Sequence, residues 1–159
     1  MESVSRLTRV SFALVPACYV YLLREADGGT QVLLQLRQGT SYMDGHWAAA
    51  AAGHVERGET AYDAARREAA EELGIGDVGL EFAFSMHRTR HAEAIDERVD
   101  WFFTAWTWTG EPRVVEPEKA AEIRWCPLDR LPEPMVPHEA YALAHLFTDR
   151  AYLTFGWQS

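Results

Sequence analysis

With 159 residues, of which 48% are hydrophobic and 25% charged, the chain has the length and composition of one globular domain rather than of a disordered protein. The formal net charge of −9 argues against a dedicated binder of nucleic acid polymers, because a phosphate backbone demands a basic surface. The apolar run over residues 10–23, which follows Arg6 and Arg9, is too short to span a bilayer, so we expect a cytoplasmic protein without a membrane segment. Cys18 and Cys126 are too few for a disulfide framework and are expected in the core.

The N-terminal part of the chain predicts a β-hairpin. Residues 13–24 are apolar and rich in β-branched and aromatic side chains, residues 27–29 (Asp-Gly-Gly) are typical of a turn, and residues 31–37 alternate as a strand does. Residues 38–47 contain two glycines and predict an exposed loop. The five consecutive alanines over residues 48–52 would by propensity alone favour a helix.

The strongest local signal predicts a helix over residues 61–73. Thr60 and Asp63 have the spacing of a capping box, the residues that follow are mostly strong helix formers, and Gly74 suits a left-handed C-terminal cap. Within this helix three glutamates stand at positions i, i+3 and i+4, which places their carboxylates on one face. These residues are Glu68, Glu71 and Glu72.

This glutamate face is costly to assemble. Like charges at these spacings disfavour a helix by about 0.2–0.5 kcal/mol per pair, and the helix dipole opposes negative charge near the C-terminal end. A divalent cation would convert the repulsion into ligation, and hard oxygen ligands suit Mg²⁺ or Mn²⁺. The alternative is a solvated face with Arg66 and Arg67 as counter-ions.

The C-terminal half predicts three more strands, over residues 80–86, 98–108 and 122–126. The second of these carries aromatic residues on both faces and should be buried on both sides. Residues 138–150 predict a closing amphipathic helix. Its expected core positions are Ala140, Leu143, Ala144, Phe147 and Ala151. Strands around one acidic helix, with a second helix at the end, predict an α/β domain with a mixed sheet.

The stretch over residues 53–75 fits the pattern G-x5-E-x7-R-E-U-x-E-E-x-G-U, in which U is an aliphatic or small residue. The fixed positions are Gly53, Glu59, Arg67, Glu68, Ala69, Glu71, Glu72, Gly74 and Ile75. This pattern resembles the Nudix box, the signature of the Nudix hydrolase superfamily. The resemblance implies the Nudix fold, a curved mixed β-sheet sandwiched between α-helices. We therefore expect residues 1–159 to form a single Nudix domain, with its core at about 14–132 and the C-terminal helix at about 138–150.

The resemblance also bears on the segment before the box, which in the family is extended and commonly ends in Pro-Gly. This chain has Ala51-Ala52 there, and we expect an extended segment in spite of its alanines. By the resemblance, Glu68 and Glu72 are direct metal ligands, and Glu71 is a ligand directly or through water. The backbone carbonyl of Ala52 completes the set. The implied cofactor is Mg²⁺, with Mn²⁺ as a substitute.

Other residues are expected to support the chemistry. Glu59 and Arg67 are similar to the family's structural ion pair, which ties the loop to the helix. Glu116, also an expected metal ligand, is the first candidate for the general base, because its loop is similar to that of the MutT-type branch, and Glu118 is the second. The alternative is that both glutamates only solvate a proline-containing loop.

The implied activity is Mg²⁺-dependent hydrolysis of a phosphoanhydride bond, by water attack at phosphorus, in a nucleoside di- or triphosphate or a nucleoside diphosphate derivative. A MutT-like nucleoside triphosphate pyrophosphohydrolase is favoured because Arg90 replaces the proline typical of ADP-ribose pyrophosphatases. The tyrosine of the diadenosine polyphosphate branch is also missing near residues 91–93. Alternatives are a catalytically silent nucleotide-binding sensor or interaction module, and isomerisation of an isoprenoid diphosphate, which needs a reactive cysteine near the metal.

Substrate contacts are less specific. Arg37, Arg88 and Arg90 are candidates for phosphate binding because the guanidinium fork suits phosphate oxygens, and Trp47 could stack on a nucleobase. The alternative places such arginines in solvent and such aromatic residues in the core. The expected partner is a small nucleotide or another diphosphate, and family members are often homodimers.

Overall fold

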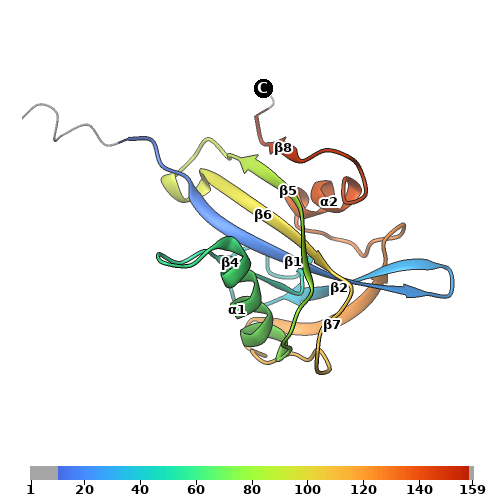
Figure 1. Cartoon of the computed structure of the whole chain (residues 1–159). Helices are drawn as coiled ribbons and strands as arrows, with labels where there is room; N and C mark the ends of the chain where they lie inside the picture. The colour runs from blue at the N-terminus through green and yellow to red at the C-terminus, as the bar shows by residue number, and fades with distance from the viewer. Residues whose placement is uncertain (1–10, 158–159) are drawn as a thin grey trace, which may run out of the picture.

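The computed structural model describes residues 11–157, so Arg6 and Arg9 lie outside the described residues. Within this range strands occupy the middle of the molecule and helices cover them (Figure 1). The strands and helices are β1 (Val15–Ala26), β2 (Gly29–Arg37), β3 (Trp47–Ala49), β4 (Ala51–His54), α1 (Ala61–Leu73), β5 (Leu80–Arg88), the 3₁₀ turn η1 (Ala94–Asp96), β6 (Arg98–Ala105), β7 (Ala120–Pro127), α2 (Pro137–Ala144) and β8 (Tyr152–Phe155). No helix in the described range is long and apolar enough to cross a membrane.

The long strand β1 organises a mixed sheet. The strand order is β3-β2-β1-β6-β5-β8, with β4 paired to β1 and β7 paired to β2. Residues 17–20 of β1 pair with β4 on one side and with β6 on the other, whereas residues 23–26 pair with β2. The β1–β6 and β5–β8 pairs are parallel and the other strand pairs are antiparallel. The predicted mixed α/β architecture is confirmed.

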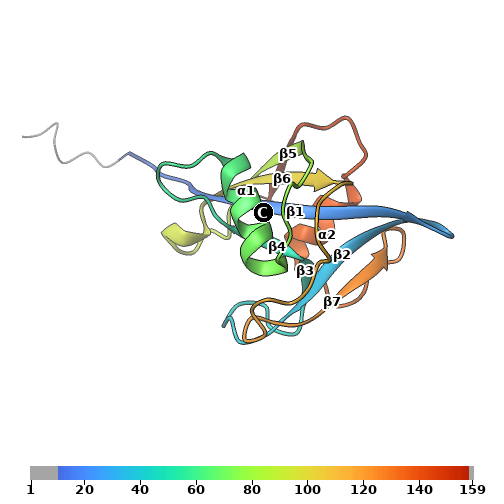
Figure 2. The same cartoon turned by 60° about the horizontal axis from the view of Figure 1, so that its bottom comes forward.

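The two helices cover opposite faces of this sheet. Tyr19 and Tyr21 of β1 pack in one buried cluster with α2, whereas Cys18 and Val20 pack in the other with α1. Because successive residues of a strand point to opposite faces, the helices must lie on either side of β1. Figure 2 shows α1 in front of the strands and α2 behind them. The sheet is therefore sandwiched between helices, as predicted.

The helix α1 has the predicted bounds and both predicted caps. The Asp63 N–H donates to Thr60 Oγ1 at 3.1 Å, and the Thr60 N–H donates to the Asp63 carboxylate at 3.2 Å. Gly74 ends the helix in the left-handed region, with φ of 68°. Local signals were sufficient here because a capping box and a C-terminal glycine act within one turn.

The alanine run is extended, as the family resemblance implied. Ala49 and Ala51 are fully buried, and these small side chains lie where β1 and β2 pair with short neighbouring strands. Trp47, a predicted nucleobase contact, is instead 5% exposed and belongs to the core. The Arg124 guanidinium lies 4.6 Å from the Trp47 ring centroid, so the ring is covered by protein.

The closing segment differs from the prediction. The helix α2 ends at Ala144 instead of residue 150, and Phe147, an expected core residue, is 63% exposed. The buried side of α2 includes His138 and Glu139, which were not among the expected core residues. An additional strand, β8, follows and pairs with β5. The prediction for β6 was too long by three residues, but Phe102 and Phe103 are buried in different clusters, which confirms that both of its faces are covered.

Candidate active site

A cavity of about 650 Å³ lies on the α2 side of the sheet. Its floor includes Ala17 and Tyr19 of β1, and the first turn of α2 and the loop around η1 contribute to its walls. One end is formed by Ala52, Gly53 and Glu72, so the cavity reaches the glutamate face of α1. Two of the predicted metal-binding residues, Glu72 and Ala52, therefore line a space large enough for a nucleotide-sized ligand.

Two of the three α1 glutamates are held close to this end. Glu72 Oε2 accepts a hydrogen bond from the Ala52 N–H at 2.9 Å, and burial, with the nearby charges of Glu68 and Glu116, raises its pKa to about 8. Burial also raises the pKa of Glu68, although Arg67 donates to it at 2.8 Å. Glu71 is half-exposed and its nearest cation is the Arg67 guanidinium at 3.4 Å.

The backbone carbonyl of Ala52 points toward the same place. Ala52 pairs with Tyr19 of β1, but its N–H donates to Glu72 and not to β1. In an antiparallel ladder both backbone groups of such a residue face away from the partner strand. The Ala52 carbonyl is therefore directed to the side on which Glu72 lies.

Arg67 ties the loop to the helix, as the resemblance implied. Its Nη2 and Nε donate to the two oxygens of Glu59 at 2.7 and 3.1 Å, and Nη2 also donates to the carbonyl oxygen of His54 at 3.1 Å. Gly53 contributes by lacking a side chain, since a Cβ there would collide with the Glu68 carboxylate. This packing fixes Glu68 against the strand that carries Ala52.

The loop before β7 brings a fourth carboxylate to the site. Glu116 raises the pKa of both Glu68 and Glu72, and its own carboxylate lies 2.7 Å from Lys119 Nζ. Glu118, the second candidate for the base, is exposed. Sequence reasoning missed Lys119, which lines the cavity together with Glu72. The sequence feature that could have drawn attention to Lys119 is that it is the only lysine of the chain.

The three arginines predicted to contact phosphate all line the cavity. Arg37 donates to the Tyr42 carbonyl oxygen and to Thr40 Oγ1, each at 3.0 Å. Arg88 is 6% exposed and donates to the Asp100 carboxylate at 2.8 Å, while Arg90 lies 3.6 Å from Asp96. A fourth arginine of the lining, Arg98, was missed because it begins a strand.

Sequence reasoning also missed two buried polar residues at the start of α2. Glu139 accepts hydrogen bonds from the Tyr21 hydroxyl at 2.9 Å and the Ala49 N–H at 2.7 Å, and burial raises its pKa to about 7. His138 Nε2 lies 3.0 Å from the Tyr19 hydroxyl oxygen. Both residues follow Pro137, but no local pattern shows that the start of a helix faces a cavity.

Two curated relatives match part of this chain in sequence. A curated relative, the isopentenyl-diphosphate Delta-isomerase of Jannaschia sp. (strain CCS1), is 32% identical over 118 residues, which cover 72% of this chain and 65% of the relative. The chain spans less than two thirds of the length of the curated relatives it matches, 65% and 60%.

Solved structures show the same fold. A MutT Nudix hydrolase from Burkholderia pseudomallei superposes with a TM-score of 0.67 at 32% identity, over 83% of this chain and 97% of that chain. The Nudix domain of NrtR from Shewanella oneidensis, solved with ADP ribose, has a TM-score of 0.68 at 18% identity and covers 91% of this chain and 96% of that chain. At that identity the likeness concerns the fold alone.

The box on α1 lies within the part of the chain that matches a known family. The model of the NUDIX domain matches residues 14–146, which include the glutamate face, the cavity and most of the sheet. The match ends within the segment that follows α2. On these grounds the chain belongs to the NUDIX domain family.

Proposed function

We propose that the protein is a hydrolase dependent on a divalent metal ion, which cleaves a phosphoanhydride bond of a nucleotide-like substrate by water attack at phosphorus. The observation that carries the proposal is that Glu72, Ala52 and Lys119 line one end of a substrate-sized cavity, with the charges of Glu68 and Glu116 close by. Phosphoanhydride cleavage requires such a cluster of oxygen ligands beside a pocket for the substrate.

The donor groups fit Mg²⁺ or Mn²⁺. Within residues 11–157 no three histidine, cysteine, aspartate or glutamate side chains are already gathered around one point at ligand spacing. Burial, and after it the charges of Glu68 and Glu116, raises the pKa of Glu72 to about 8, and a bound cation would favour its ionised form. Glu68, Glu72 and the Ala52 carbonyl would hold the ion, with Glu71 and Glu116 as further oxygen ligands. When bound, the ion supplies charge neutralisation on phosphate oxygens and a water of lowered pKa.

The remaining residues of the site orient these groups. Glu116 is the first candidate for accepting the proton of the attacking water, with Glu118 as the second. Lys119 compensates the charge of Glu116 and lines the cavity, where its ammonium can contact a phosphate oxygen. Arg67 and Glu59 hold the box loop on α1 and transfer no proton.

The substrate is proposed to be a nucleoside triphosphate or a nucleoside diphosphate derivative, with Arg37, Arg88 and Arg90 on the walls of its pocket. The likeness to the MutT hydrolase supports the first class, and the ADP ribose bound by the NrtR domain adds the second to the compounds worth assaying. The isomerase relative suggests a different reaction, which needs a reactive thiol. Cys18 opposes this reaction because it is fully buried, which raises its pKa to about 12.

The test is a turnover assay on a panel of nucleoside triphosphates, nucleoside diphosphate sugars and ADP ribose with Mg²⁺ or Mn²⁺. Glu72→Gln should lower the rate by about 10³-fold or more, because a metal ligand is lost, whereas Glu81→Gln on the exposed part of β5 should not change it. An unchanged rate in Glu72→Gln contradicts the metal role. Tight nucleotide binding without metal and without turnover would favour the sensor instead.

A further inference from the structure

The loop between β2 and β3 packs against the turn that precedes β7. The Gln38 N–H donates to the Lys119 carbonyl oxygen at 3.0 Å, and Gln38 Nε2 donates to the Pro117 carbonyl oxygen at 2.6 Å. Figure 2 shows the two segments side by side, one in cyan and the other in orange. We call residues 38–46 the β2–β3 loop and residues 116–119 the Glu116 turn. Two hydrogen bonds from one residue therefore join the loop to the turn.

Gly39 allows the loop and the turn to approach closely. Its backbone lies in the left-handed region, with φ of 65°. A Cβ at this position would collide with the carbonyl oxygen of Glu118. Because this oxygen belongs to the backbone, it can move away only if the turn moves with it. Glycine suits a position that combines a left-handed backbone with such a close contact. A side chain at position 39 would therefore displace the Glu116 turn or the β2–β3 loop.

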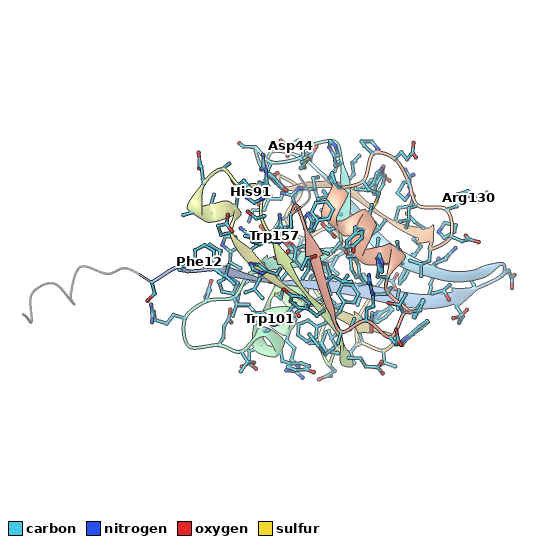
Figure 3. All side chains as sticks on the ribbon, turned by 90° about the horizontal axis from the view of Figure 1, so that it is seen from above. Phe12, Asp44, His91, Trp101, Arg130 and Trp157 are labelled. Carbon is cyan, nitrogen blue, oxygen red and sulfur yellow. The ribbon has the colours of Figure 1, made fainter. Side chains whose placement is uncertain are left out.

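The β2–β3 loop is fixed by its own hydrogen bonds. The Asp44 carboxylate accepts from the Thr40 N–H and hydroxyl at 3.1 and 2.6 Å, and from the Ser41 N–H at 3.3 Å. The Gly45 N–H donates to the Arg37 carbonyl oxygen at 2.8 Å. Asp44 is exposed and lies at the edge of the molecule (Figure 3), so these bonds hold the loop without burial of the carboxylate in the core. The loop can therefore support the turn that it contacts.

The chain just before the Glu116 turn is tied to α1. The Val115 N–H donates to the Glu72 carbonyl oxygen at 3.2 Å, and the Arg113 N–H donates to the Leu73 carbonyl oxygen at 3.1 Å. These carbonyls belong to the last turn of α1, where a helix provides no partner of its own. The turn is therefore held from two directions, by α1 before it and by the β2–β3 loop along it.

The Glu116 turn presents a carboxylate and an ammonium next to Glu72. The Lys119 N–H donates to the Glu116 carbonyl oxygen at 2.9 Å, and Lys119 Nζ lies 2.7 Å from the Glu116 carboxylate. Both residues line one small cavity together with Glu72. Groups that act in a reaction must be held within about 0.5 Å of their productive positions by the residues behind them. A contact that fixes the turn therefore acts on the groups beside Glu72.

We propose that Gln38 and Gly39 are positioning residues for the hydrolysis, which hold the Glu116 turn so that Glu116 and Lys119 stay beside Glu72. The hydrogen bonds to α1 fix the chain before the turn, whereas those from Gln38 fix the turn itself. Neither Gln38 nor Gly39 lines the large cavity, so both act through the turn and not by contact with the substrate. The description of Glu116 and Lys119 as groups of the reaction rests on the proposed function.

The test follows Lys119 directly, because it is the only lysine of the chain. Protein labelled with ¹³Cε-lysine gives one side-chain signal from the Glu116 turn, which is recorded by NMR in EDTA without metal. Gly39→Ala should shift this signal, because non-bonded carbon and oxygen atoms prefer about 3.5 Å and the added Cβ displaces the contact by roughly 1 Å. With Mg²⁺ and a substrate from the nucleotide panel, the same variant should lower kcat by about 10²-fold, with a smaller change in KM.

Gly45→Ala is the matched control, because Gly45 lies in the same loop with φ of 81°, but a Cβ there would meet no atom within 4 Å. It carries the same backbone strain without the collision and should keep the signal and kcat of the wild type. Gln38→Met keeps the length of the side chain and removes the donor to Pro117. It should shift the signal in the same direction as Gly39→Ala and lower kcat by roughly fivefold, the effect of one neutral hydrogen bond. This variant carries the test if Gly39→Ala does not fold.

A shifted Lys119 signal together with a lowered kcat supports the proposal. The proposal is overturned if the variants give the signal and the kcat of Gly45→Ala, or if one of the two quantities changes without the other. These outcomes leave the hydrolase intact, because the wild type is assayed separately. A wild type that turns over no compound of the panel rejects the hydrolase, and the metal-free signal then decides alone whether Gln38 and Gly39 hold the turn.

Discussion

Gly53→Ala tests whether the absence of a side chain before the box holds the site together. A Cβ at this position would lie 2.9 Å from Glu68 Oε2 and closer still to the Cδ and Oε1 atoms of the same carboxylate. Non-bonded carbon and oxygen atoms prefer about 3.5 Å or more, so the carboxylate must move by roughly 1 Å. The backbone of Gly53 is not in the left-handed region, and the collision is therefore the main cost.

The expected effects of Gly53→Ala on the turnover rate and on the stability of the fold differ in size. A displacement of about 1 Å in a group that positions the reaction lowers the rate by about 10²-fold, or roughly 2.7 kcal/mol. The folded protein loses only the 2.8 Å hydrogen bond between Arg67 and Glu68, which contributes about 1 kcal/mol or less at this partly exposed position. We therefore expect a large loss of turnover with nearly normal stability.

The assay compares kcat with urea unfolding for Gly53→Ala and for Gly76→Ala, whose added Cβ would meet only Thr109 Oγ1 at 3.4 Å. A second comparison uses Glu68→Asp, since the shorter side chain withdraws from the new methyl. Gly53→Ala should then cost little in the Glu68→Asp background. The reasoning is refuted if Gly53→Ala retains full turnover, or if the two substitutions act additively.

Three further predictions concern the same site and its surroundings. Arg67→Met should destabilise the protein by about 1 kcal/mol in urea unfolding and lower turnover, because the box loop loses its tie to α1; equal stability would show that the ion pair with Glu59 contributes nothing. Mg²⁺ at about a hundred times its Kd should stabilise the wild type by about 2.7 kcal/mol in thermal unfolding, and the shift should shrink in Glu72→Gln. The folded-state pKa of Glu139, about 7, lies above its ordinary value of 4.5, so its contribution to stability is fully present below pH 4.5 and is lost as the pH rises through 7. Metal-free Glu139→Gln should therefore gain stability relative to the wild type as the pH rises through this window. If urea titrations give the same difference in unfolding free energy between the two proteins at every pH, the raised pKa of Glu139 is contradicted.

Local features of this protein follow from short-range geometry. The bounds of α1, its capping box and its Gly74 cap depend on contacts within a turn or two, so the sequence pattern predicts them correctly. The extended alanines were a harder case, because propensity favoured a helix and only the family resemblance indicated strands. Their burial between paired strands is a property of the whole sheet, which the helix propensity of single residues does not take into account.

The segment around α2 shows where the sequence pattern misleads. Hydrophobic periodicity placed Phe147 in the core and did not include the polar residues at the start of the helix, whereas in the structure Phe147 is exposed and His138 and Glu139 are buried. Glu139 can be buried because Tyr21 and Ala49, far away in the chain, donate hydrogen bonds to it. Buried polar groups require such partners, and a partner from another element leaves no trace in the local pattern.

The sequence alone determined that three carboxylates share one face of α1, because helical spacing is fixed by the backbone whatever surrounds it. Only the tertiary structure decided what that face meets. The loop before β7 brings Glu116 and Lys119 to it, and the pairing of β1 with β4 and β6 sets Ala52 and Arg98 on opposite sides of β1 in the lining of one cavity. These juxtapositions depend on strand register and chain crossing, which are set by the packing of the whole sheet and by no single segment.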